Sequence, residues 1–220
     1  MAKLRMKFRK EDQAAYISHL DLMRTLQRAF LRAGYVIRHS QGFHPHPLMS
    51  IVLPLPVGQS SACELVDFET VGETDCAALT EALNHAMPYG IHVEECYAAE
   101  RPVRELALLR AHVTFFYDHG VPAEAGEKLK ALFARETVLV EKRTKHKELA
   151  EVDIRPMLQS VEIAPCEKTV EILATVQAQN PGVNPMLLQQ AVERYLPDLA
   201  PDFCRVHRLA FLDETGEKFR

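Results

Sequence analysis

The chain opens with a stretch in which apolar and basic side chains alternate. This period of two, over residues 3–10, predicts a half-buried strand. Residues 18–34 instead repeat with the period of a helix, with Ser18 as a favourable N-cap and Gly34 just after the last turn. A strand followed by an amphipathic helix is therefore predicted at the start of the chain.

The same patterns recur and give a repeated order of elements. In the first half they predict a helix at 75–87 and extended segments at 35–40, 48–58, 62–71 and 91–98. In the second half they predict helices at 122–135 and 184–196 and extended segments at 108–118, 137–143, 150–163, 168–178 and 204–212. We therefore predict an α+β protein with two tandem ferredoxin-like (βαββαβ) halves and antiparallel sheets. The halves are residues 1–100 and 106–220. The extended segment at 150–163 is an additional one that a single βαββαβ unit does not need.

Composition is that of an ordinary globular protein, with 47% hydrophobic and 25% charged residues. No apolar run reaches the roughly 18 residues that a membrane span needs, so we expect no membrane association and a cytoplasmic location. The five cysteines are isolated from one another, which argues against a disulfide framework or a zinc ribbon. We expect no metal and no cofactor. Phosphate-loop, dinucleotide, esterase and zinc-protease motifs do not occur in the sequence.

Charge is strongly segregated along the first half. Residues 1–50 carry nine Lys or Arg against three acids, whereas residues 51–100 carry nine acids and no Lys or Arg. A polyanion would be attracted to the first stretch and repelled by the second. We expect a local contact with nucleic acid rather than indiscriminate coating.

Two groups of residues could make that contact. One is an arginine stripe on the solvent face of the predicted helix, formed by Arg24, Arg28 and Arg32, which can bind phosphate or be only a solvated face that pairs with Asp21. The other is a second basic run on a predicted hairpin tip, with Lys142, Arg143, Lys145 and Lys147. Such runs are also common on solvated surfaces.

The segment "SQGFHPHP", residues 40–47, combines a flexible glycine with two stiffening prolines. Each residue before a proline is driven to an extended conformation, which fixes the orientation of Ser40, Gln41, His44 and His46. This rigid polar loop favours recognition of an anionic or base-bearing ligand, with catalysis as the second interpretation.

These segments together resemble the radical SAM-linked protein family, a bacterial domain of unknown function found fused to, or encoded beside, B12-binding-type radical SAM proteins. The resemblance rests on "SHLD" at 18–21, the arginine-rich helix, "SQGFHPHP", "LPVG" at 55–58 with Ser61, and Glu64. His44 stands where the family usually has asparagine, whereas His46 keeps the family position. The chain has no C-x-x-x-C-x-x-C run, the signature of the radical enzymes themselves.

The resemblance implies an accessory or substrate-binding protein that works with a radical SAM enzyme, and we expect RNA, either tRNA or rRNA, as the substrate. We predict one concave site in the N-terminal half, formed by Ser18, His19, Asp21, Arg24, Arg28, Arg32, Ser40, Gln41, His46 and Glu64. One alternative is a metal-independent ribonuclease in which His19 and His46 act as general acid and base. The other is a purely structural partner subunit.

Overall fold

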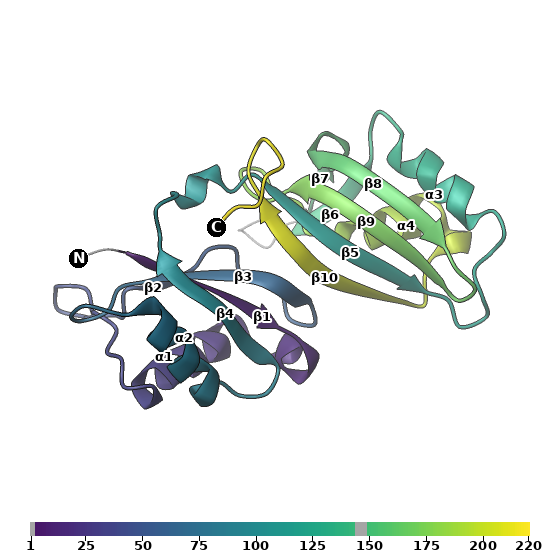
Figure 1. Cartoon of the computed structure of the whole chain (residues 1–220). Coiled ribbons are helices and arrows are strands. Elements are labelled where there is room, and N and C mark those ends of the chain that lie inside the picture. The colour runs from purple at the N-terminus through teal and green to yellow at the C-terminus, as the bar shows by residue number, and fades with distance from the viewer. Residues whose placement is uncertain (1–2, 144–148) are drawn as a thin grey trace. The chain divides into compact units, whose positions relative to one another are not determined.

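The computed structural model describes residues 3–143 and 149–220. The chain divides into two compact units, residues 3–105 with Arg220 and residues 106–219. The first unit has the elements β1 (Leu4–Lys10), α1 (His19–Arg32), β2 (Met49–Ile51), β3 (Ser60–Phe68), α2 (Cys76–Ala86) and β4 (Ile91–Ala98). The second has β5 (Leu108–Phe116), α3 (Ala125–Phe133), β6 (Leu139–Arg143), β7 (Leu149–Asp153), β8 (Leu158–Pro165), β9 (Thr169–Gln177), α4 (Leu187–Tyr195) and β10 (Phe203–Leu212) (Figure 1).

The first unit is an antiparallel sheet in the order β4-β1-β3-β2, with both helices packed on one face. The apolar residues of β1 that the alternation predicted, with alternate residues of β3, pack against α1 and α2 to form the core. Helix α1 begins after Ser18, whose Oγ accepts the Asp21 backbone N–H at 3.2 Å, as the sequence predicted. Gly34 follows the helix with φ +82°.

The second unit contains an antiparallel sheet in the order β10-β5-β9-β8. The predicted strand at 137–143 forms β6, which pairs with β7 in a separate two-stranded sheet. The predicted extended segment at 150–163, which a single βαββαβ unit does not need, contributes to two strands. These are β7 and, from Leu158, the strand β8 of the larger sheet. The sequence patterns therefore predicted the strands of this unit. They did not predict which strand pairs with which, because strand pairing depends on residues that are far apart in the sequence.

Candidate functional site

The segment that carries "SQGFHPHP" is a short hairpin attached to the end of β3. The Leu48 backbone N–H donates to the Arg38 carbonyl at 2.7 Å, and the Arg38 N–H donates to the Glu69 carbonyl at 2.8 Å. The Ser40 N–H donates to the His46 carbonyl at 2.8 Å. These bonds fix the two arms of the hairpin, so residues 41–45 form its tip.

Side chains strengthen the same closure. The His46 backbone N–H donates to Ser40 Oγ at 3.1 Å, and Ser40 Oγ lies 2.8 Å from His46 Nδ1. Gly42 at the tip has φ +131°, a conformation that favours glycine. The loop is thus a defined structure, as the two prolines suggested, and Ser40 and His46 are direct partners in it.

The tip presents Phe43, a residue that the sequence reasoning did not single out. Its side chain is fully exposed, at 101% of the reference area. Burial of a phenylalanine is worth roughly 1.5–3 kcal/mol, so a ring held away from the core forgoes that stabilisation. Phe43 is therefore a candidate contact residue, and its exposure could not be seen from the amino-acid pattern.

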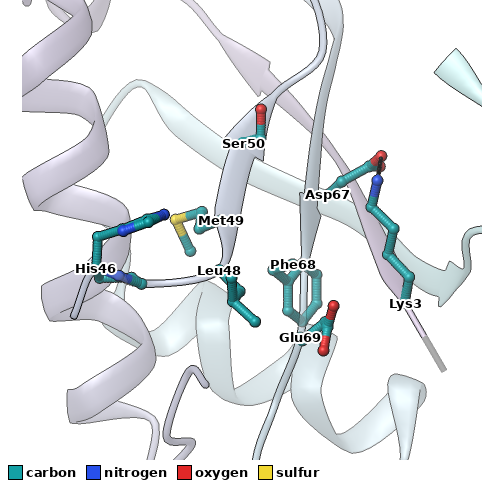
Figure 2. A pocket seen from close by; sticks show the side chains of 9 residues that line it. Lys3, His46, Leu48, Met49, Ser50, Asp67, Phe68 and Glu69 are labelled. Atoms are coloured by element: carbon teal, nitrogen blue, oxygen red, sulfur yellow. Dashed lines mark ion pairs between the residues drawn. The ribbon is translucent and has the colours of Figure 1, made fainter. Parts of the chain in front are cut away.

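A pocket of about 390 Å³ lies beside the hairpin and is lined by Lys3, His46, Pro47, Leu48, Met49, Ser50, Asp67, Phe68 and Glu69. In the view of Figure 2, His46 and Met49 lie on one side of Phe68, and the ion pair between Lys3 and Asp67 lies on the other. The pocket therefore offers an imidazole, a hydroxyl and an ammonium group around an apolar floor.

Asp67 is the most strongly paired group of this pocket. Its carboxylate accepts two hydrogen bonds from Arg5, at 2.6 and 3.1 Å, and lies 2.7 Å from Lys3 Nζ. Burial raises the pKa of Asp67, but the bonds from Arg5 and Lys3 outweigh it and leave the pKa below its ordinary value. Glu69 is likewise paired, with Arg38 at 2.6 Å. The negative charge of each carboxylate is therefore balanced by a cationic side chain, so the two acids give the pocket no net negative charge.

The arginine stripe lies on the exposed face of α1 as predicted. Arg24 pairs with Asp21 at 3.3 Å, and Arg32 donates to the Ala86 carbonyl at 2.6 Å. Arg28 is exposed on the same face. A hydrogen bond from Ser18 Oγ is the largest cause of the lowered pKa of Asp21. Pairing along the helix therefore holds for Arg24, whereas phosphate binding by the stripe stays a prediction.

The residues of the predicted site lie on segments that are anchored at opposite ends of β3. The Gly58 N–H donates to the Ala15 carbonyl, which anchors the start of α1, with Ser18 and His19, beside the start of β3. The hairpin with His46 is anchored by Glu69 beyond the other end of β3. The nine residues of β3 lie between the two anchors and span roughly 30 Å at about 3.3 Å each. The segments that carry His19 and His46 are therefore anchored far apart, which argues against their action as an acid–base pair on one phosphate. The single concave surface stays a prediction.

The other predicted residues are also divided. Gln41 is exposed at the tip of the hairpin, near Ser40 and His46. Glu64 lies in the middle of β3, opposite Phe8 of β1, and is fully buried, so it is part of the interior rather than the start of a strand at a surface. The hairpin and its pocket, not the N-terminus of α1, form the candidate site.

The second basic run is only partly described. Lys142 in β6 donates to the Gly182 carbonyl at 3.3 Å and lines a groove of about 740 Å³ between the β6–β7 hairpin and α4. The Arg143 side chain, Lys145 and Lys147 lie outside the described residues. Glu141, Glu193 and Arg194 share the groove with Lys142, so its charge is mixed.

Two further features concern the described residues as a whole. Within residues 3–143 and 149–220, no group of three or more His, Cys, Asp or Glu side chains is arranged to hold a metal ion. In the same part of the chain, no helix combines the length and the apolar character that crossing a bilayer requires.

Comparisons with solved structures find a likeness of fold. A chain in a crystal structure of a Cbf5–Nop10–Gar1 complex matches 93% of this chain with a TM-score of 0.50 and 10% sequence identity. The match takes in 47% of that chain, so the present chain spans about half its length. A crystal structure of an unknown protein from Galdieria sulphuraria matches 94% of this chain and 98% of that chain, with 11% identity and a TM-score of 0.28. Curated protein sequences give no match.

The sequence itself matches a family profile over most of its length. The profile is described as an uncharacterized protein conserved in bacteria (DUF2344), and it matches residues 3–185. That range contains α1, the "SQGFHPHP" hairpin and the pocket beside it. Because the match covers well over half of the sequence, the chain belongs to this bacterial family.

Proposed function

We propose that this protein is an RNA-binding accessory protein that recognises a substrate for a radical SAM enzyme. The observation that carries the proposal is the hairpin at 38–48, a closed loop that presents a fully exposed phenylalanine. Unpaired bases stack on aromatic side chains, and such stacking is sequence-tolerant because every base has a π-face. A rigid loop loses little conformational entropy when a base stacks on its tip.

Polar groups around the hairpin suit the rest of a nucleotide. His44 and Gln41 are exposed at the tip, beside Phe43, and can hydrogen-bond to base edges. Lys3, whose side chain is 54% exposed, lines the adjoining pocket and can approach a phosphate while it remains near Asp67. The pocket is large enough for part of a nucleotide, and Leu48, Met49 and Phe68 are among the residues that line it.

The radical SAM partner follows from the resemblance of the motifs, and the family description names no partner. In this proposal the partner supplies the radical chemistry and this chain supplies substrate recognition, in the cytoplasm. We also assign each unit the ferredoxin-like topology. The strand orders β4-β1-β3-β2 and β10-β5-β9-β8, each with two helices between strands, support that assignment, with the β6–β7 hairpin as an insertion.

The test is fluorescence anisotropy with a labelled 12-nucleotide single-stranded RNA, at 50 and 200 mM KCl. The wild-type protein is expected to bind with an affinity that falls steeply with salt, because bound cations release counterions from the RNA. Phe43→Leu removes the ring and keeps an apolar residue, and should weaken binding about tenfold. The matched control is Tyr89→Leu, which removes a ring that is 78% exposed elsewhere in the first unit and should bind like wild type.

Two results would overturn the proposal. One is wild-type binding no stronger, at both salt concentrations, than that of an unrelated acidic protein. The other is equal binding by Phe43→Leu and wild type, which would remove the hairpin from the interface. For the partner, co-purification of the neighbouring radical SAM protein with the tagged chain is expected, and its absence from the eluate would contradict that part.

A further inference from the structure

The sheet of the second unit has one buried face and one open face. Along β5 and β9, alternate residues such as Val113 and Ile172 are buried, and the residues between them are partly or fully exposed. The buried set faces the same interior as the apolar residues of α3 and α4. The opposite face is not covered by a helix of this unit and carries polar and aromatic side chains.

An aromatic and cationic cluster lies at one end of this open face. Phe203 of β10 is paired in register with Phe116 of β5, and their ring centroids are 5.7 Å apart. The Arg205 guanidinium lies 5.2 Å from the centre of the Phe116 ring. Phe203 is 53% exposed although it belongs to a strand. Two rings, tilted by 44° to each other, and a guanidinium group thus lie next to one another on this face.

A fixed polar group adjoins this cluster. Glu171 of β9 accepts a hydrogen bond from Thr114 Oγ1 at 2.8 Å, and its carboxylate lies 3.0 Å from His112 Nε2. Thr114 is in register with both Glu171 and Arg205, so these three residues form one row across the face. The carboxylate is therefore oriented beside the rings rather than mobile.

Charge on this face favours an anion near β10. Arg205 is exposed, and no carboxylate pairs with it among the residues that the structure describes. Arg110 of β5 is also exposed on this face, three residues before Val113. The acids of the face, Glu171 and Glu162, lie on β9 and β8. A polyanion would therefore follow β10 and β5.

We propose that this open face is a second RNA-contacting surface, which binds a single strand across β10 and β5. One base stacks on Phe203, the adjacent phosphate contacts Arg205, and the Glu171 carboxylate accepts a hydrogen bond from the amino group of a neighbouring base. The inference rests on the proposed function for the identity of its ligand, but it concerns a surface in the other unit. An exposed ring beside an arginine suits single strands, because the bases of a duplex are already stacked on one another.

The test compares two variants with the same labelled 12-nucleotide single-stranded RNA. Phe203→Leu is expected to weaken binding about tenfold through loss of stacking. Arg205→Gln is expected to weaken binding several-fold and to reduce the slope of log affinity against log salt by about 0.7, the value for one phosphate contact on a single strand. Tyr89→Leu again serves as control, and circular dichroism melting checks that each variant folds.

The outcomes separate this inference from the proposed function. If wild type binds RNA and both variants bind equally well with an unchanged salt slope, the open face is not an RNA surface, although the proposed function stands. If wild type does not bind RNA, both this inference and the proposed function are wrong. If Phe203→Leu loses co-purification of the radical SAM protein but keeps full RNA affinity, the face binds a polypeptide and the inference is wrong. Weaker RNA binding by Phe203→Leu, with Tyr89→Leu unchanged, supports it.

Discussion

The two units place a similar pair of a basic and an acidic side chain on equivalent strands but bury it to different extents. In the first unit, Arg5 of β1 and Asp67 of β3 are paired with side chains only 1% and 2% exposed. In the second, His112 of β5 and Glu171 of β9 are paired with side chains 42% and 30% exposed. A buried pair stabilises one arrangement of strands, whereas a half-exposed pair remains available to a ligand. We therefore assign the first a structural role and the second a role in recognition.

The largest expected effect is on stability. Asp67→Asn removes the charge that balances Arg5 in the interior and should lower the free energy of unfolding by about 3–5 kcal/mol. Glu171→Gln breaks a half-exposed pair and should cost at most about 1 kcal/mol. Urea denaturation followed by circular dichroism measures both. Equal losses for the two variants would contradict the difference in role between the pairs.

A second, smaller effect concerns the stability of the protein at acidic pH. The folded-state pKa of Asp67 is lowered, so its contribution to stability is present above its unfolded pKa, near 4, and is lost as pH falls through the folded value. Wild type should therefore lose stability as the pH falls below about 5, and Asp67→Asn should lose less stability over the same range. Urea midpoints across pH 3–7 measure this. Parallel curves for the two proteins would show that Asp67 does not carry the acid response.

A third prediction concerns the hairpin alone. Ser40→Ala removes the hydroxyl that accepts the His46 N–H and contacts Nδ1, and should destabilise the first unit by about 1 kcal/mol. RNA affinity should fall several-fold because the loop becomes less ordered before binding. Ser160→Ala, at an exposed position of β8, is the matched control. An RNA affinity unchanged by Ser40→Ala would mean that the closure of the loop does not matter for recognition.

The smallest effect tests which face of β10 is open. Burial raises the pKa of Cys204 to about 12 and that of Cys96 to about 11, so both thiols should react slowly with iodoacetamide at pH 8. Cys166 is exposed and should be labelled first. Mass spectrometry of tryptic peptides over time gives the order. Rapid labelling of Cys204 would indicate that the side of β10 opposite Phe203 and Arg205 is open instead.

Local features of the fold were predictable because they depend on neighbours in the sequence. Helix α1 follows from its apolar period and from Ser18, and β1 follows from strict alternation. The pairing of β6 with β7, and the place of β8 in the sheet, depend on contacts between distant residues and were not predicted. Sequence order alone also suggested that His19 and His46 meet, whereas β3 separates the segments that carry them.

The candidate site was predictable only in part. The loop of residues 40–47 was identified from its glycine and prolines, and Ser40 and His46 are partners in it. Phe43 and Phe203 were missed because the alternation of apolar residues says nothing about which of them remain exposed. Asp67 was missed as well, although a charged residue within an apolar strand was a signal that could have found it; its register with Arg5 is visible only in the structure.

The most direct test of the account maps where RNA touches the protein. Ultraviolet light should cross-link a uridine-rich single strand to the wild-type chain, and mass spectrometry of the peptides then identifies the attached residues. The account predicts cross-links in two peptides, one that contains Phe43 and one that contains Phe203, each lost in the corresponding leucine variant. Cross-links confined to α1 or to the groove beside α4, with none at either phenylalanine, would contradict it.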